Sequence, residues 1–512
     1  MKPTDEQQQA IDLFLQGGDL AIEAGAGTGK TSTLVLISEA AQGYGQYVAF
    51  NKALVDESGH KFDPRRVRAN TAHSLAFRTV GKHFADRLPG KPGSAARMTS
   101  RQIAEALDLV PFSTFTFEDK PRTLPVGFLA TLVTKAVRQF CQSGDPELSS
   151  RNFPFVEGID VPGHYDRNNQ LRQFLLPYTR RVWEDVTRPD GRLPYAHEHY
   201  LKLWQLSDPF IPADYILFDE AQDANPVIAA IVAAQQDHSQ LVYVGDSQQE
   251  IYAWTGAVNA LANVKVDHRT FLTQSFRFGQ PIADEANVVL RELGTTMQLR
   301  GNPDIESTVE PVANPAAILT RTNATAIQML IKFQEEGIEP HVVGGGKDVI
   351  AFANGAQQLM STGSTTHPDL APFGSWQEVC NYVSSPDEDG EDLQLLVRLV
   401  SQFGPVQIIR SLEAMPREDQ ADIILSTGHK SKGRQWKTVL LTPDFVRKNA
   451  DEADLRLLYV AMTRAQKTLD IGRVKDARAA LELAKAEAAT QDDGAFERTA
   501  EQVRLRHEQL EV

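Results

Sequence analysis

Cysteine is scarce in this sequence, and long hydrophobic runs are missing. The 512 residues include 2 cysteines, Cys141 and Cys380, which lie far apart. Such a pair excludes a disulfide framework and a cysteine-rich zinc site, and low use of cysteine is typical of a reducing compartment. No apolar run is long enough to span a bilayer, and residues 1–9 lack the apolar core of a signal peptide. We therefore expect a cytoplasmic protein that contacts no membrane.

Net positive charge is also missing. The formal net charge is −15, while the contents of 42% hydrophobic and 23% charged residues are ordinary for a globular chain of several domains. An acidic chain has no general positive field for nucleic acid, although a local basic channel is compatible with this charge. We expect any affinity for nucleic acid to be modest and sensitive to salt.

What the sequence does contain is a glycine-rich loop. It consists of Ala24, Gly25, Ala26, Gly27, Thr28, Gly29, Lys30 and Thr31, with Ser32 directly after it. Residues 20–24 predict a buried strand before the loop, and residues 31–41 predict a helix after it. The glycines let backbone N–H groups surround phosphates, and the helix N-terminus adds partial positive charge. We expect a site for ATP and Mg²⁺, in which Lys30 reaches the terminal phosphates and Thr31 binds the metal.

Two carboxylates follow a second strand-like run. Residues 215–218 are apolar, and Asp219 and Glu220 come directly after them. Ligands of parallel α/β sheets bind at the carboxyl ends of strands, so both side chains are expected near the glycine-rich loop. Asp219 would hold Mg²⁺, and Glu220 would orient and deprotonate the attacking water. The alternative is an ordinary acidic loop after a buried strand.

The order of strand-like and helical stretches predicts an α/β fold that is interrupted twice. Strands are expected at residues 46–50, 65–70, 215–218, 241–244, 422–426 and 438–441. Helical patterning from about residue 81 to 205 predicts an inserted helical domain. A second α/β pattern begins near Gln280, and the mixed stretch 347–418 within it is interpreted as a smaller insertion. The residues after 473 predict a solvated helix.

Polar and aromatic residues follow the run at 241–244. Gln248 is placed to sense the terminal phosphate of a nucleotide, and Tyr252 and Trp254 come shortly after it. Aromatic rings that stack on bases contribute roughly 1–3 kcal/mol each and tolerate any base. The alternative is that both rings belong to the core. Arg277 and Arg464 are candidate site residues only because they occur together with the other motifs, since single arginines on helices are usually solvated or paired.

In this order, the segments resemble the UvrD/Rep-type superfamily 1 DNA helicases. Thr4 and Gln7 match the adenine-recognition motif of that family, and the glycine-rich loop matches motif I. Motifs II to VI match residues 219–223, 245–257, 276–277, 427–436 and 459–465. The whole ordered set is far more specific than any one motif. Residues 48–52 and 195–207 look closest to the F-box DNA helicase branch, although Gln7 lies too near the start for an F-box to precede it.

The resemblance implies two RecA-like parallel-sheet motor domains with ATP in the cleft between them. The first would comprise residues 1–80 and 206–278, with a helical insertion at 81–205. The second would comprise residues 279–346 and 419–475, with a small insertion at 347–418. A helical C-terminal tail would follow at 476–512.

The resemblance also implies a role for each matching residue. Phe276 would stack on adenine, and Gln7 would hydrogen-bond its edge. Gln248 would contact the γ-phosphate, Arg277 would border the cleft, and Arg464 would be the arginine finger of the second domain. Single-stranded DNA would cross both domains over Phe50, Asn51, Thr71, His73, Tyr252, Trp254 and His429.

The sequence departs from the family pattern at two places. Thr255 stands where the family often has arginine, so one contact with a DNA phosphate would be missing. Gln435 stands where the family usually has glutamate, so an amide would replace a carboxylate in the contact with the ribose. Neither change removes the hydrolysis chemistry.

The leading hypothesis is an ATP-dependent DNA helicase that moves 3′ to 5′ on single strands and acts on tailed duplexes, in repair, recombination or replication. The polarity comes from the resemblance alone. Two alternatives stay open. One is a DNA-stimulated ATPase that remodels protein–DNA complexes without unwinding. The other is the motor subunit of a helicase–nuclease, although the C-terminal tail has no Asp…Asp/Glu-x-Lys cluster.

Overall fold

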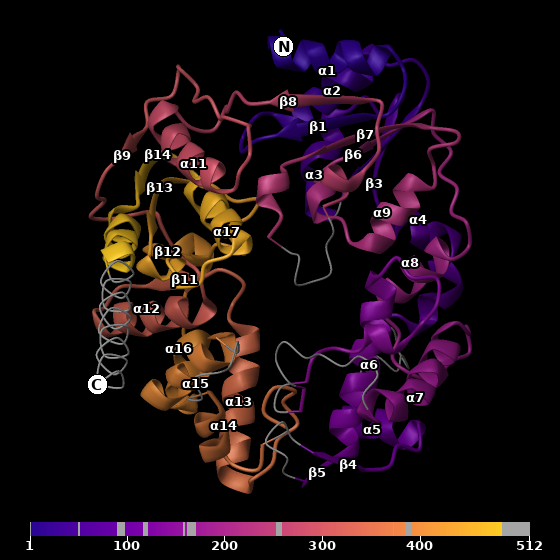
Figure 1. Ribbon diagram of the computed structural model, residues 1–512, viewed down its shortest axis with the longest axis vertical. Coiled ribbons are helices and arrows are strands. Elements are labelled where there is room, and N and C mark those ends of the chain that lie inside the picture. Colours follow the sequence, from indigo (N-terminus) through magenta and orange to yellow (C-terminus); the bar gives the residue numbers. More distant parts are fainter. Residues whose placement is uncertain are drawn as a thin grey trace, which may run out of the picture.

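Two parallel β-sheets form the frame of the molecule (Figure 1). The computed structural model describes residues 2–49, 52–89, 98–115, 121–156, 159–160, 170–251, 259–371, 373–383 and 391–483. Over these residues each large sheet has six strands, and all pairings within the two sheets are parallel. The expected α/β class with two parallel-sheet cores is confirmed.

The first sheet has the strand order β3-β2-β6-β7-β1-β8. Its strands are β1 (Leu20–Ala24), β2 (Gly45–Ala49), β3 (Val67–Thr71), β6 (Tyr215–Phe218), β7 (Gln240–Gly245) and β8 (His268–Leu272). Its helices are α1 (Asp5–Leu15), α2 (Lys30–Ala40), α3 (Lys52–Ser58), α4 (Ala72–Thr79), α9 (Pro226–Ala233) and α10 (Ala260–Asn263). The strands predicted at 20–24, 215–218 and 241–244 are confirmed, and their apolar runs are buried in the parallel sheet. The predicted strands at 46–50 and 65–70 correspond to β2 and to β3, an edge strand in which Arg68 is exposed.

Between α4 and β6, the described residues form four α-helices and a hairpin. The helices are α5 (Ser100–Ala106), α6 (Val126–Gln142), α7 (Gln170–Val186) and α8 (His197–Gln205). The strands β4 (Phe112–Phe115) and β5 (Pro121–Leu124) pair with each other in an antiparallel hairpin, which the sequence pattern did not predict. Among the described residues, nothing between β3 and β6 adds a strand to the first sheet.

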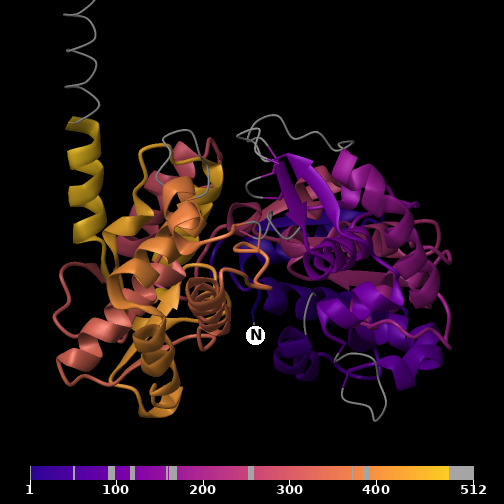
Figure 2. The same ribbon diagram turned by 90° about the horizontal axis from the view of Figure 1, so that it is seen from below.

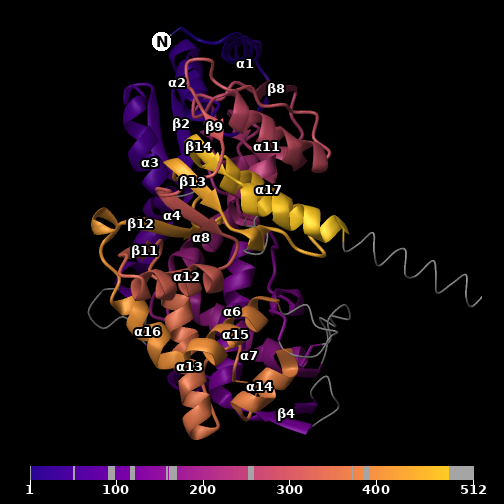
Figure 3. The same ribbon diagram turned by 90° about the vertical axis from the view of Figure 1, so that its left-hand side faces the viewer.

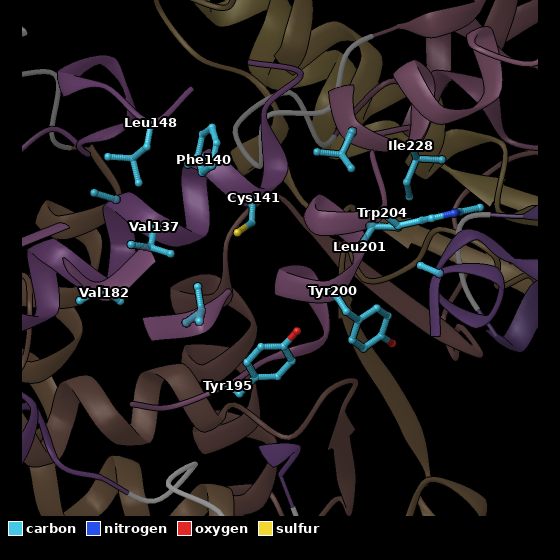
Figure 4. Packing of buried hydrophobic residues seen from close by; sticks show 14 of the residues in the cluster. Val137, Phe140, Cys141, Leu148, Val182, Tyr195, Tyr200, Leu201, Trp204 and Ile228 are labelled. Atoms are coloured by element: carbon cyan, nitrogen blue, oxygen red, sulfur yellow. The ribbon is translucent and has the colours of Figure 1, made fainter. Parts of the chain in front are cut away.

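These helices share one core with the first sheet. Figure 4 shows side chains of α6, α8 and α9 packed together, including Phe140, Trp204 and Ile228. The same buried cluster continues into the sheet at Val48 and Phe218. The helical region is therefore built onto a face of the sheet rather than around a core of its own.

The second sheet has the strand order β11-β12-β10-β13-β14-β9. Its strands are β9 (Thr308–Val309), β10 (Ala317–Thr320), β11 (Pro340–Val342), β12 (Ile423–Thr427), β13 (Trp436–Leu441) and β14 (Ala465–Asp470). Its helices are α11 (Gln280–Glu292), α12 (Asn323–Glu335) and α17 (Glu452–Met462). A further helical stretch covers residues 472–483.

The stretch 347–418 forms helices throughout most of its described part, where the sequence suggested a mixed region. These are α13 (Lys347–Thr362), α14 (Trp376–Val383), α15 (Glu391–Phe403) and α16 (Pro405–Glu413). Among the described residues of this stretch, Gly363 ends α13 and Pro368 lies in the turn before α14. Phe352 and Ile408 share a buried cluster with Ile318 and Leu440 of the second sheet, so this region is also built onto a sheet.

Short 3-10 helices complete the regular structure. They lie at Gly59–Lys61, Gly81–Arg87, Ser150–Asn152, Ala221–Asp223, Ser247–Gln249, Glu418–Gln420 and Pro443–Phe445.

The two halves lie side by side, and both sets of inserted helices extend toward the end of the molecule opposite α1 (Figures 1, 2 and 3). One buried cluster joins the halves: Ala26 and Ile251 of the first half pack among apolar residues of the second, including Tyr459. In the part of the chain that the structure describes, no helix has the length and apolarity to cross a bilayer.

Candidate nucleotide-binding site

The glycine-rich loop connects β1 to α2, as the sequence predicted. Gly27 and Gly29 adopt φ values of 74° and 80°, which favour glycine. A Cβ at Gly27 would lie 2.7 Å from Cβ of Arg277, so the close approach also requires glycine. The N–H of Phe276 donates to the Gly27 carbonyl at 2.8 Å, which fastens the loop to the segment after β8. Gly29 is the N-cap of α2, and no side chain makes a capping hydrogen bond at this helix N-terminus.

Both predicted carboxylates meet this loop at the carboxyl end of β6. Nζ of Lys30 lies 2.7 Å from Oε2 of Glu220. The hydroxyl of Thr31 donates to Oδ2 of Asp219 at 3.3 Å, and the hydroxyl of Tyr47 donates to the same oxygen at 2.8 Å. Tyr47 lies on β2, and its buried position among apolar neighbours gave no sequence signal for this contact.

The electrostatics differentiate the two carboxylates. Burial and the neighbouring Glu220 raise the pKa of Asp219 to about 6. Burial also acts to raise the pKa of Glu220, but Lys30 and Lys432 outweigh it and lower this pKa to about 2. Glu220 has a φ of 53°, an unfavourable conformation for a side chain larger than glycine. A charged carboxylate is thus held in a strained backbone position beside the loop.

Two guanidinium groups, one half-buried and one buried, approach from the border of the second half and from the second half itself. Nη1 of Arg277 donates to the carbonyl of Thr463 at 2.9 Å, and Nε donates to Oε1 of Gln435 at 3.1 Å. Arg464 is 1% exposed, and its Nη2 donates to Oε1 of Gln249 at 3.2 Å. Burial lowers the pKa of Arg277, and burial with Arg277 nearby lowers the pKa of Arg464 to about 9.

In the described part of the chain neither arginine forms a direct salt bridge, although the charges of Glu220 and Asp246 favour their protonated forms. Within the described ranges, the partners of Arg277 and Arg464 are neutral carbonyl, amide and hydroxyl oxygens, and neither cation pairs with a carboxylate. Buried cations are expensive unless an anion accompanies them. The residues present therefore fit an anionic ligand such as a nucleotide triphosphate.

The segment after β7 places two amides side by side. Oε1 of Gln248 is buried and has no hydrogen-bond partner among the residues described. Gln249, which the motif pattern did not single out, donates to Oδ2 of Asp246 at 2.6 Å and accepts from Arg464. An orphaned buried oxygen calls for a partner that the protein alone does not supply.

Three residues converge at the other end of the loop. A Cβ on Gly29 would lie 3.4 Å from both Nε2 of Gln7 and the ring of Phe276. The Gln7 amide is held in place, since Nε2 donates to Thr33 at 3.2 Å and Oε1 accepts from the Thr4 N–H at 3.1 Å. The Phe276 ring is 47% exposed. An exposed ring beside a fixed amide is suited to a planar heterocycle.

Contacts between the halves add residues that the sequence reasoning did not assign. Nζ of Lys432 lies 2.6 Å from Oδ2 of Asp223, and both side chains are largely buried. The hydroxyl of Tyr459 on α17 accepts from the N–H of Ala26 at 3.1 Å. The pattern around each residue suggested a motif, but not a partner several hundred positions away.

The residues predicted to contact DNA are less completely placed. Thr71 caps α4 by accepting from the N–H of Ser74 at 3.0 Å. His73 packs edge-on against Tyr200 of α8, with ring centroids 6.0 Å apart, and burial lowers its pKa. His429 is half-buried just after β12. Of the residues predicted to bind the nucleotide, Ser32 and Gln435 are exposed. The remaining predicted residues lie outside the described ranges: Phe50, Asn51, Tyr252 and Trp254.

Metal binding by the protein alone is not supported by the described residues, since no group of three or more His, Cys, Asp or Glu side chains is arranged to hold an ion. Magnesium in phosphate-transfer sites usually takes one or two protein ligands and completes its shell with phosphates and water. The pair Thr31 and Asp219 fits that limited role.

Family comparisons agree with this geometry. Residues 7–255 match a family model described as an AAA domain, and residues 422–471 match the UvrD-like helicase C-terminal domain. F-box DNA helicase 1 of Gallus gallus is 30% identical over 527 residues, which cover 92% of this chain and 49% of the relative. F-box DNA helicase protein 1 of Schizosaccharomyces pombe is 28% identical over 510 residues, which cover 91% and 57%.

A more distant match is DNA helicase II of Haemophilus influenzae, at 24% identity over 317 residues, which cover 56% of this chain and 39% of the relative. The chain spans about half the length of the two F-box helicases that it matches.

Proposed function

This chain belongs to the UvrD-like helicases, and we propose that it is an ATP-dependent DNA helicase that moves 3′ to 5′ along single-stranded DNA. The observation that carries the proposal is the pair of guanidinium groups of half-buried Arg277 and buried Arg464, neither bonded to a carboxylate, next to a phosphate-binding loop. Arg464 belongs to the second half but contacts Gln249 of the first. A triphosphate between the halves would bind both, and its loss would release one half from the other.

We assign the hydrolysis chemistry to the cluster around the loop. Ala24 to Ser32 would surround the phosphates, and Thr31 with Asp219 would hold Mg²⁺, which neutralises charge on the phosphates when bound. Glu220 would take the proton of the attacking water, and Lys30, Gln248, Arg277 and Arg464 would stabilise the charge that develops. These groups come from both halves, so the site is complete only when the two halves lie close together.

The nucleoside end of the site is assigned to a second group. Phe276 would stack on the base, Gln7 would bond its edge, and Gln435 would contact the ribose. Support comes from the convergence of Gln7 and Phe276 on Gly29 and from the bond that joins Gln435 to Arg277.

We propose that single-stranded DNA crosses the carboxyl ends of both sheets over the predicted set Phe50, Asn51, Thr71, His73, Tyr252, Trp254 and His429. Thr71 is the last residue of β3 and His429 comes two residues after β12, so both lie at the carboxyl ends of strands. The domain limits given above, the preference for tailed duplexes and a cytoplasmic location belong to the same proposal.

The proposal is tested by measuring ATP hydrolysis with and without single-stranded DNA. We expect DNA to raise the hydrolysis rate of the wild-type chain and Lys30→Ala to abolish hydrolysis. Lys332→Ala is a suitable control, because this lysine is 71% exposed on α12. Hydrolysis that is equally fast with and without DNA would contradict the proposal.

A further inference from the structure

We propose that Tyr459 is a positioning residue that holds the glycine-rich loop and the Asp246 turn of the first half against α17, the helix of the second half that ends shortly before Arg464. The inference rests on the proposed function. Tyr459 lies on α17 and is 0% exposed. Its hydroxyl accepts from the N–H of Ala26 at 3.1 Å and donates to Oδ2 of Asp246 at 3.1 Å. One side chain of the second half thus bonds two separate segments of the first.

The contact is part of a closed circuit of hydrogen bonds. Asp246 accepts from Tyr459 and from Nε2 of Gln249, the latter at 2.6 Å. Oε1 of Gln249 accepts from Arg464, which also donates to Oγ1 of Thr463 at 3.1 Å. Thr463 in turn donates to the carbonyl of Tyr459 at 2.9 Å. The circuit crosses between the halves twice and returns to its starting residue.

The circuit controls the groups that are proposed to act on the terminal phosphate. Oδ1 of Asp246 also accepts from the N–H of Gln248 at 3.1 Å, so the same carboxylate orients the turn that carries the orphaned amide. Ala26 is in the glycine-rich loop itself. Tyr459 therefore fixes the loop, Gln248 and Arg464 relative to one another, without a contact that needs to involve the nucleotide.

Only a hydroxyl of this reach satisfies both partners. Ala26 offers a donor and Asp246 an acceptor, so the bridging atom must accept and donate at once. Burial raises the pKa of Tyr459 well above its usual value, which keeps the O–H proton available for Asp246. Phenylalanine fills the same space but leaves a buried N–H and a buried carboxylate oxygen without this partner.

The test compares Tyr459→Phe with Tyr215→Phe. Tyr215 is a matched control because it is equally buried, lies in the first sheet and has a hydroxyl without a partner among the described residues. In DNA-stimulated hydrolysis we expect Tyr459→Phe to lower kcat roughly 10- to 100-fold, as expected for misplaced catalytic groups, with the KM for ATP within about 3-fold of wild type. Tyr215→Phe should match the wild type in both constants.

Further outcomes separate this inference from the proposed function. A wild-type chain without DNA-stimulated hydrolysis overturns both. A normal wild type with unchanged kcat in Tyr459→Phe overturns this inference alone, as does a rise in KM at constant kcat. A fall in activity that disappears when rates are divided by the folded fraction, measured by thermal melting, also overturns it, because the hydroxyl would then be purely structural.

A second variant tests the circuit by another route. Gln249→Ala interrupts it between Asp246 and Arg464. If both residues act through the same circuit, the double variant should lose less kcat than the product of the two single losses. Losses that simply multiply would show that Tyr459 and Gln249 act independently, which contradicts the circuit.

Discussion

The ammonium of Lys30 lies 2.7 Å from Oε2 of Glu220, so the lysine of the phosphate-binding loop is paired with the proposed general base. This pairing keeps Glu220 ionised, since its pKa is lowered to about 2 despite burial. Phosphates that bind Lys30 compete with Glu220 for the same cation. We infer that the arriving nucleotide draws Lys30 away from Glu220. Because Glu220 is then buried without this cation, its pKa rises and it becomes a stronger base.

Replacement of Glu220 separates binding from hydrolysis. Glu220→Gln keeps the shape of the side chain but removes the base, so we expect turnover to fall at least ~10²-fold while ATP still binds. Titration with a fluorescent nucleotide and steady-state hydrolysis measure the two effects. Glu39→Gln, an exposed change on α2, is the control. Near wild-type turnover in Glu220→Gln would show that this residue is not the base.

Arg464 is expected to act on the transition state. Arginine fingers contribute on the order of 10³-fold or more to turnover, so Arg464→Ala should bind ATP nearly normally and hydrolyse it poorly. Arg464 belongs to the second half, and its guanidinium donates to Gln249 of the first half, which fits action across the contact between the halves. Arg417→Ala, at an 80% exposed side chain, provides the control. The role is wrong if affinity collapses while turnover at saturating ATP stays normal.

Glu23 should make stability depend on pH. Its carboxylate accepts from the N–H and hydroxyl of Ser247 at 2.7 and 2.8 Å, and burial with Asp246 nearby raises its pKa from 4.5 to about 7. The folded chain therefore binds a proton that the unfolded chain releases between about pH 4.5 and 7. This group stabilises the fold less as pH rises through that window.

Glu23→Gln removes this titration. We expect the variant to gain stability relative to wild type between pH 5 and pH 8, by about 1–3 kcal/mol. Urea unfolding at several pH values measures the difference, with Glu39→Gln as the control. A difference between Glu23→Gln and wild type that is constant over this range would rule out a raised pKa for Glu23.

Substitution of two tryptophans distinguishes a side chain that binds DNA from one that packs in the core. Trp254→Ala should weaken binding of single-stranded DNA by roughly 1–3 kcal/mol and preserve basal hydrolysis. Trp204 is 2% exposed within the core of Figure 4, so Trp204→Ala should instead destabilise the fold by about 3–5 kcal/mol. Melting temperature, basal hydrolysis and DNA affinity on one preparation distinguish the two. Loss of stability with unchanged DNA affinity in Trp254→Ala would mean that Trp254 packs.

The sequence predicted strands best where both faces are buried. The apolar run of β6 is unmistakable, and so is the glycine-rich loop that follows β1. By contrast, β8 was not predicted because its first three residues, His268, Arg269 and Thr270, are polar and leave no apolar run of strand length. The strand β14 was also missed, since polar residues interrupt its apolar pattern and Lys467 in its middle is exposed. Half-exposed strands carry too little apolar signal to be distinguished from loops.

Local patterns located much of the candidate site but not the bonds across it. Gln248 and Gln249 are chemically identical neighbours, and only the 3-10 turn decides that Gln249 meets Arg464. Tyr459 and Ala26 are 433 positions apart, so their hydrogen bond follows from the packing of two sheets against each other. Spacing within a motif contains no information about such a contact.

Strand displacement on tailed duplexes tests the central claim most directly. Two duplexes with the same paired sequence, one with a 3′ single-stranded tail and one with a 5′ tail, are incubated with the wild-type chain and ATP. A 3′-to-5′ helicase separates the 3′-tailed duplex in an ATP-dependent reaction and leaves the 5′-tailed duplex paired. ATP hydrolysis that is stimulated by both DNAs while neither is separated would contradict the helicase assignment and favour a remodelling ATPase.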